Sequence, residues 1–176
     1  LYSEYMKAAL QDGMYCMPLA FAFPQDAFAR QVEDEVMIGE SLLIAPVYEQ
    51  NARGRYVYLP EEMLQVRVKC GEGNRIETSV LPAGHHYIPV ALTEVVFFVR
   101  KGHMLPLAKG GRDIQTVADV DFADLRLLAY APDGAAYTYY TDDGETKDYN
   151  NPEHFVHITL DAKGTAQSDH AAVKVE

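Results

Sequence analysis

The sequence predicts a mainly β protein in which a short α/β segment precedes antiparallel β-sandwich modules. Two observations carry this prediction. Most of the chain consists of short β-like runs separated by turns that contain Gly or Pro, a pattern typical of sandwiches. Only the first part, to about residue 45, combines helical periodicity with continuous apolar runs of strand length.

In the α/β segment, residues 1–10 have apolar side chains at helical spacing, and Gly13 is placed to end that helix. The continuous apolar run over residues 14–23 predicts a strand buried on both faces, as in a parallel sheet. Residues 27–38 show helical spacing again, and residues 42–48 predict another apolar strand. Because a natural chain rarely starts inside an amphipathic helix, we expect that a further segment precedes this one.

The remaining chain predicts eight short strands, and its turns carry glycine or proline, for example at Gly71–Gly73 and Asp143–Gly144. These strands are expected over residues 56–59, 64–70, 76–81, 86–90, 95–100, 125–131, 137–141 and 155–160. The polar stretch over residues 109–124 predicts a connector between two β modules. We therefore expect three parts: closing elements of a (β/α)8 barrel over residues 1–45, a proximal β-sandwich over 46–108 and a distal β module over 109–176.

The composition limits the classes of partner and compartment. With 176 residues and 48% apolar side chains, the chain can fold around a real core. Its net charge of −11 argues against nucleic acid and anionic membranes as partners, and no apolar run approaches the length of a membrane span. Cys16 and Cys70 fit no metal or redox motif. We expect them to be buried free thiols, which favours a cytoplasmic protein.

Five segments, in order, carry a resemblance to a known family. They are Pro18–Pro24 (PLAFAFP), Asp34–Val47 (DEVMIGESLLIAPV), Arg55–Pro60 (RYVYLP), Phe98–Pro106 (FVRKGHMLP) and, more weakly, Tyr139–Glu145 (YYTDDGE). Each resembles a motif in the C-terminal part of glycoside hydrolase family 31, the α-glucosidase type, and the order and spacing agree to about residue 160. Members of the family often have an Arg where Met17 stands and a Trp-Tyr-Asp stretch after the Tyr-Leu-Pro; this chain has no Trp.

The resemblance implies a parent with a (β/α)8 barrel and C-terminal sandwich modules, which hydrolyses α-linked glucosides with retention. Retaining hydrolysis needs two carboxyl groups about 5–5.5 Å apart. In this family both are Asp residues on earlier barrel strands, and neither motif that contains them occurs in this sequence. The resemblance thus implies that this chain is a non-catalytic portion whose partner is the remainder of the barrel. We assign no catalytic residue, cofactor or metal ligand.

Several groups of polar residues are candidates for metal or catalytic sites, but an ordinary structural role is favoured for each. The acidic turn of Asp142, Asp143, Glu145 and Asp148 lacks the spacing of a calcium loop and is interpreted as a solvated hairpin. Adjacent residues on a strand point to opposite faces, so His85 and His86 are not expected to share a metal, and neither are His154 and His157. Glu33 and Asp34 are adjacent on a predicted helix and would point apart, so we interpret Asp34 as structural.

The aromatic residues leave two interpretations open. Phe21 and Phe23 lie on the predicted last barrel strand, where core packing is favoured over contact with a sugar. Tyr137, Tyr139 and Tyr140 are either a sugar-stacking platform or ordinary tyrosines of a half-buried strand, and the second is favoured.

Two alternatives to an enzyme portion remain: a stand-alone carbohydrate-binding β-sandwich and a structural or oligomerisation domain. If the barrel partners are absent, Leu19, Phe21, Phe23 and residues 42–44 should be exposed, and we expect the isolated chain to self-associate.

Overall fold

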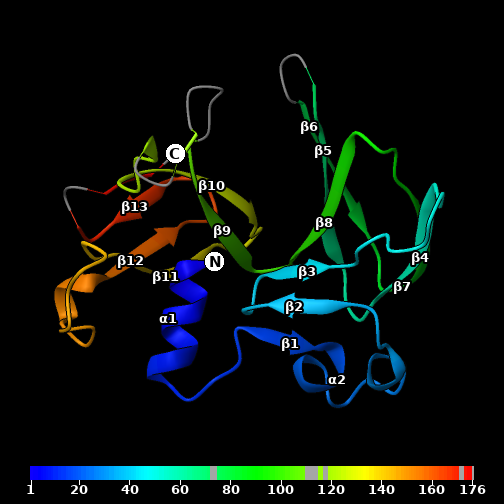
Figure 1. Ribbon diagram of the computed structural model, residues 1–176, viewed down its shortest axis with the longest axis horizontal. Helices are drawn as coiled ribbons and strands as arrows, with labels where there is room; N and C mark the ends of the chain where they lie inside the picture. The colour runs from blue at the N-terminus through cyan, green and yellow to red at the C-terminus, as the bar shows by residue number, and fades with distance from the viewer. Residues whose placement is uncertain (72–74, 110–114, 117–118, 171–172, 176) are drawn as a thin grey trace. The chain divides into compact units, whose positions relative to one another are not determined.

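A computed structural model describes residues 1–71, 75–109, 115–116, 119–170 and 173–175 (Figure 1). The chain divides into two compact units. Met14–Lys101 form the first, here called the proximal unit. Leu1–Gly13 together with Gly102–Glu176 form the second, here called the distal unit.

The proximal unit contains two sheets. A six-stranded antiparallel sheet has the order β1-β2-β3-β8-β5-β6, and a two-stranded antiparallel sheet pairs β4 with β7. The strand bounds are β1 Cys16–Pro18, β2 Val36–Ile38, β3 Leu42–Ile44, β4 Gly54–Leu59, β5 Met63–Lys69, β6 Arg75–Leu81, β7 Gly84–Pro89 and β8 Glu94–Arg100. Two short helices, α2 (Leu19–Ala22) and the 3₁₀ turn Ala29–Gln31, lie between β1 and β2.

The core of the proximal unit lies between these two sheets, as expected for a sandwich. Val57, Leu59 and Ile88 point inward from β4 and β7, and each is at least 95% buried. They share one cluster with buried side chains of the larger sheet and of α2: Leu19, Met37, Leu43, Met63 and Phe98.

The described residues of the distal unit form two three-stranded sheets, the helix α1 and the 3₁₀ turn Pro152–His154. One sheet has the order β14-β10-β9 and the other β11-β12-β13; the β10–β14 pair is parallel. The strands are β9 His103–Ala108, β10 Asp124–Tyr130, β11 Ala135–Tyr140, β12 Phe155–Leu160, β13 Ala166–Ser168 and β14 Lys174–Val175. Their inward side chains form a second cluster: Met104, Leu125, Tyr139, Val156, Ile158 and Val173.

The N-terminal helix α1 (Tyr2–Leu10) lies against β11 of this unit. Ser3 is buried, and its hydroxyl donates to the carbonyl of Tyr140 at 3.2 Å and accepts from the Tyr140 N–H at 3.1 Å. Glu4 accepts from the Tyr137 hydroxyl at 2.6 Å, and Lys7 lies 4.2 Å from the centre of the same ring. The helix therefore supplies the layer that covers the tyrosines of β11.

The mainly antiparallel β fold is confirmed, and each of the eight predicted strands is present, Phe155–Leu160 with the expected bounds and the other seven with at least one end shifted. Two expectations for the N-terminal part are wrong. The expected buried parallel strand over residues 14–23 is a three-residue antiparallel strand followed by α2. The expected helix over residues 27–38 is a 3₁₀ turn followed by β2, because Val36–Ile38 pair with both β1 and β3.

The cysteines and the apolar segment also differ from expectation. Cys16 and Cys70 are free as predicted, but both are exposed. Leu19 and Leu43 are fully buried in the proximal core, whereas Phe21 is 64% exposed. Most of the apolar segment that was expected to be exposed without the barrel is therefore packed within the proximal unit, because β3 pairs with β8.

Residues 16–44 supply three strands to the sheet that β8, β5 and β6 complete, so the compact proximal unit begins at Met14 and not after residue 45. The assignment of residues 1–45 to a barrel stays a prediction. No helix among the described residues is long and apolar enough to cross a membrane.

Candidate functional site

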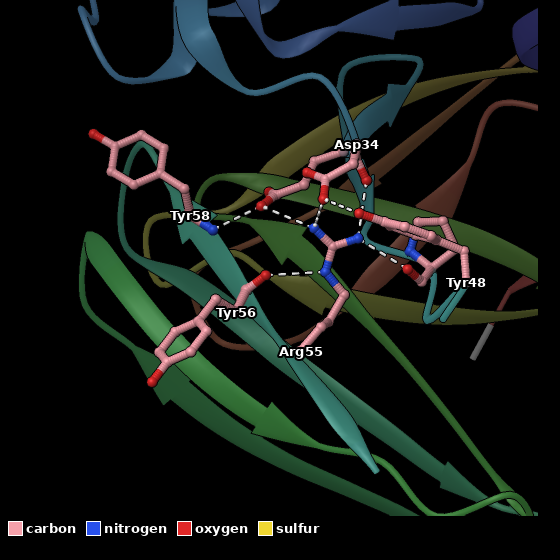
Figure 2. A network of polar contacts seen from close by, with 7 residues as sticks. Asp34, Tyr48, Arg55, Tyr56 and Tyr58 are labelled. Atoms are coloured by element: carbon pink, nitrogen blue, oxygen red, sulfur yellow. Dashed lines mark hydrogen bonds and ion pairs between the residues drawn. The ribbon is translucent and has the colours of Figure 1, made fainter. Parts of the chain in front are cut away.

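A network of polar contacts around Arg55 is the most elaborate polar feature of the proximal unit (Figure 2). The Arg55 Nη2 lies 2.7 Å from the Asp34 Oδ2, and its Nη1 donates to the carbonyls of Asp34 and Pro46 at 3.1 and 2.9 Å. Its Nε donates to the Tyr56 carbonyl at 2.9 Å. The Tyr48 hydroxyl also donates to the Asp34 Oδ2, at 3.1 Å. One guanidinium thus joins β4 to the segment before β2 and to the loop after β3.

Glu35 is the buried carboxyl group of this network. Its side chain is 2% exposed, its Oε1 accepts the Tyr58 N–H at 2.7 Å, and its Oε2 has no hydrogen-bond partner. A guanidinium nitrogen, the Arg55 Nη2, lies 3.8 Å from the Oε1. Burial therefore raises the pKa of Glu35 to about 7, against the lowering effects of the Tyr58 hydrogen bond and the Arg55 charge.

The local fold explains why these groups meet. β4 pairs with β7 along one of its edges. This pairing leaves the Tyr58 N–H for another partner, and the Glu35 carboxylate accepts it. Gly54 begins β4 with a φ of 154°, and a Cβ there would lie 2.3 Å from the Ile88 carbonyl oxygen. The tight approach of β4 to β7 at this point therefore requires glycine directly before Arg55.

The two adjacent carboxylates do not form a hydrolytic pair. Contrary to expectation residues 33–35 are not helical, and the carboxylates of Asp34 and Glu35 both approach the Arg55 Nη2. A retaining glycosidase needs one carboxylate as nucleophile and one as acid, and both must touch the sugar. Glu35 is buried and Asp34 is paired with Arg55, so the geometry supports the structural role predicted for Asp34.

The tyrosines weighed as a sugar platform are core residues. Tyr139 and Tyr140 are 9% and 1% exposed, and Tyr140 packs edge-on against Tyr2 and Phe155. Burial and the neighbouring Glu4 raise the pKa of Tyr137. These side chains stabilise the distal unit and are not available to stack on a sugar.

Sequence reasoning missed an exposed aromatic surface on the other side of β4. Alternation along the strand sends Val57 and Leu59 into the core, and Figure 2 shows Tyr56 and Tyr58 leaving β4 on the side opposite Arg55. Tyr56 is 71% exposed and forms an edge-on pair with Tyr87 of β7, 5.2 Å between ring centres. The alternation predicts one outward face for this strand, but not whether another layer covers it.

The remaining polar candidates have structural roles. The Asp142 Oδ1 accepts the Gly144 N–H, and the Asp143 Oδ1 accepts from the backbone of Glu145 and Thr146, which lowers the pKa of Asp143. This is the hairpin turn that was favoured. Within the ranges that the structure describes, no three His, Cys, Asp or Glu side chains gather as a metal site.

The histidine and phenylalanine candidates do not come together either. His85 lies on the outward face of β7 against Tyr58, whereas the His86 Nε2 lies 2.8 Å from the Pro82 carbonyl. His154 lies in a 3₁₀ turn and His157 on β12. Phe21 lies on α2 and not on a strand, and Phe23 packs under the Arg100 guanidinium at 4.8 Å. Gly71 is described, but the two residues that follow it in the predicted glycine turn lie outside the described part of the chain.

Comparison with known proteins agrees with this picture. The model of the glycosyl hydrolase family 31 C-terminal domain matches residues 13–105. A 1,6-α-glucosyltransferase of Sporosarcina globispora is 30% identical over 86% of this chain and 11% of its own length, and human neutral α-glucosidase AB is 29% identical over 79% and 14%. A Flavobacterium johnsoniae family 31 dextranase shares the fold over 92% of this chain and 19% of its own, with a TM-score of 0.70 and 23% identity.

The matched region of each relative is small. The chain spans between 11% and 22% of the length of the curated relatives that it matches. The family model that matches more than half of the chain describes a C-terminal domain. The chain therefore belongs to glycoside hydrolase family 31 and matches the C-terminal domain of that family.

Proposed function

We propose that the parent of this chain is a retaining hydrolase of α-linked glucosides and that this chain stabilises its catalytic barrel. The observation that carries the proposal is the match of the family 31 C-terminal domain to residues 13–105, together with relatives described as α-glucosidases. The catalytic carboxylates are assigned to the rest of the parent, since Asp34 is paired with Arg55 and the adjacent Glu35 is buried.

The proposed stabilising role in the parent follows from contacts that hold the segments of each unit together. Arg55 and Glu35 fix three segments of the proximal unit to one another, and Ser3 and Glu4 fix α1 to β11 of the distal unit. Under the proposed assignment of the N-terminal residues to a barrel, α1 would link that barrel to the distal strands. A cytoplasmic location remains part of the proposal, supported by the two unpaired cysteines.

The test is release of nitrophenol from an aryl α-glucoside, measured in parallel on the full-length parent and on this chain, with an aryl α-xyloside as a second substrate. The proposal expects turnover of the glucoside by the parent and none by this chain. Turnover by this chain would contradict the non-catalytic assignment. A parent that acts only on the xyloside would contradict the proposed substrate.

Self-association of the isolated chain also stays a proposal. Its support is now Phe21, because Leu19 and Leu43 are buried. Sedimentation velocity over a hundredfold concentration range should show a rising mean mass for the wild-type chain and a constant one for Phe21→Ser. A wild-type chain that stays monomeric would refute it.

A further inference from the structure

The outward face of the β4–β7 sheet carries a continuous group of aromatic rings, here called the aromatic face. Cross-strand pairing places Tyr56 opposite Tyr87 and Tyr58 opposite His85. The ring centres are 5.2 Å apart in the first pair and 4.8 Å in the second. Phe28 adds a fifth ring, 5.7 Å from Tyr58 and 5.5 Å from His85.

The aromatic face is held in place by polar contacts beneath and beside it. The Tyr58 hydroxyl donates to the Asp26 Oδ2 at 2.7 Å, and the other oxygen of Asp26 accepts the N–H groups of Phe28 and Ala29. These contacts lower the pKa of Asp26 and, with burial, raise that of Tyr58 to about 12. Phe28 and Tyr58 are thus fixed before any ligand arrives, which reduces the entropy lost on binding.

One end of the aromatic face opens into a hollow of about 430 Å³. That volume falls within the range of roughly 300–1,000 Å³ that is typical of small-molecule sites. The side chains that line it and matter here are Asp34, Tyr48, Glu49, Arg53, Tyr56 and Tyr87. Tyr48 is 66% exposed, and its hydroxyl is oriented by the Asp34 carboxylate. The hollow therefore combines tyrosine rings from β4, β7 and the loop after β3 with charged groups of both signs.

This combination favours a polyhydroxylated ligand over an apolar one. A pyranose ring offers C–H groups that pack on aromatic faces and hydroxyls that bond to carboxylate, guanidinium and phenol groups. An apolar protein surface would desolvate the Arg53 charge and the Tyr56 and Tyr87 hydroxyls without supplying hydrogen-bond partners. The exposed rings belong to tyrosines, one phenylalanine and one histidine. All of these side chains except the phenylalanine carry a polar atom.

We propose that the aromatic face and its hollow form a carbohydrate-binding site for α-linked glucan chains. Tyr56 and Tyr87 supply the stacking surface, and Asp34, Arg53 and Tyr48 bond to the sugar hydroxyls in the hollow. The choice of an α-glucan rests on the proposed function, whereas the presence of a sugar site rests on the geometry. Such a site would hold a long substrate close to the enzyme.

The test is titration of the wild-type chain with maltohexaose and with isomaltohexaose, followed by amide NMR shifts, with cellohexaose as the β-linked control. Saturable shifts confined to residues 26–28, 48–58 and 84–89 are expected for at least one α-glucan. The double variant Tyr56→Ala/Tyr87→Ala should weaken that affinity at least about tenfold. Tyr149→Ala removes a tyrosine that is 50% exposed in the distal unit and should leave the affinity unchanged.

Each outcome is decisive. No saturable shift with either α-glucan, or equal affinity in wild type and double variant, would overturn the site. Equal binding of cellohexaose would overturn the α-glucan assignment and keep a sugar site. The double variant must retain the wild-type amide spectrum outside β4 and β7, and if it does not, the single variants Tyr56→Phe and Tyr87→Phe are compared with Tyr56→Ser and Tyr87→Ser. Nitrophenol release by the parent is scored separately, so failure of this site and failure of the proposed activity are distinguished.

Discussion

The tyrosines of β11 and of β4 follow the same strand alternation and have opposite environments. On β11, Tyr139 and Tyr140 are at least 91% buried, and the Tyr137 hydroxyl donates to Glu4 of α1. On β4, Tyr56 is 71% exposed, whereas Tyr58 is partly buried, packs against Phe28 and His85 and donates through its hydroxyl to Asp26. The same residue type on the same kind of element thus stabilises the fold in one unit and faces outward in the other.

The difference shows that the role of a tyrosine on a strand depends on whether another layer of the protein covers that face of the strand. The distal unit brings α1 against β11, although about 130 residues separate them in sequence. In the proximal unit the inward face of β4 takes the core contacts through Val57 and Leu59. Of the outward tyrosines, Tyr58 is partly buried and packs against this core, whereas Tyr56 is largely exposed.

The largest expected effect separates these two groups. Tyr140→Ala should lower the free energy of unfolding of the distal unit by about 3–5 kcal/mol, because it empties a site packed by Tyr2 and Phe155. Tyr56→Ala should cost at most about 1 kcal/mol, the value of one cross-strand aromatic pair. Urea unfolding followed by circular dichroism measures both. Equal losses would break the comparison.

A slightly smaller effect is expected at the Arg55 network. Arg55→Met should lower the free energy of unfolding of the proximal unit by about 3 kcal/mol, because it leaves Glu35 buried without a cation. The double variant Arg55→Met/Glu35→Gln should recover part of that loss, since the uncompensated charge is gone. Arg126→Met, at an exposed position on β10, is the matched control and should change stability by less than about 0.5 kcal/mol. A loss that the second substitution does not reduce would contradict this account of the network.

Glu35 also predicts a pH dependence of stability in the proximal unit. Its pKa is raised in the folded state from 4.5 to about 7, so the folded protein binds this proton more tightly than the unfolded chain. The associated stability is fully present below pH 4.5 and is lost as the pH rises through 7, by about 2–3 kcal/mol. Unfolding at pH 4 to 8 should show this loss in the wild type relative to Glu35→Gln. Parallel pH profiles of the two proteins would contradict the burial of the charge.

The smallest expected effect concerns the layer that covers β11. Tyr137→Phe removes the hydroxyl that donates to Glu4 and leaves the ring beside Lys7 in place. The expected loss is about 1–2 kcal/mol, typical of a hydrogen bond to a charged partner. Tyr58→Phe, which removes the bond to Asp26, is its counterpart in the proximal unit. Tyr137→Phe should also increase hydrogen exchange along α1, and unchanged exchange there would show that Glu4 does not hold the helix.

The β part of the fold was predictable because its strands are punctuated by turn residues. Arg75–Leu81 and Phe155–Leu160 begin and end within one residue of the expected bounds. The N-terminal part was less predictable, because residues 36–38 pair with β1 and β3 although their spacing predicts a helix, whereas residues 42–44 lie in the strand expected there. Tertiary pairing there overrides local propensity, as it does for short apolar runs in general.

The candidate site was less predictable than the fold. Asp34 was correctly assigned a structural role, but Arg55 received none, since a salt bridge across 21 residues leaves no local signal. The exposure of Tyr56 and Tyr87 was not predicted, because alternation along a strand predicts the face on which a side chain lies but not whether another layer covers that face. Cys16 and Cys70 were expected to be buried from their apolar neighbours, yet both lie at ends where their strands leave the sheet pairing, and both are exposed.

Nitration of tyrosines, mapped by mass spectrometry with and without an α-glucan, tests the central comparison most directly. The reagent attacks accessible phenolates, so Tyr48, Tyr56 and Tyr87 should react, whereas burial should protect Tyr137, Tyr139 and Tyr140. Saturating α-glucan should protect Tyr56 and Tyr87 and leave Tyr149 reactive. Reaction at Tyr139 and Tyr140 as fast as at Tyr56, or no protection by any α-glucan, would contradict the division between tyrosines that hold the fold and tyrosines that face a ligand.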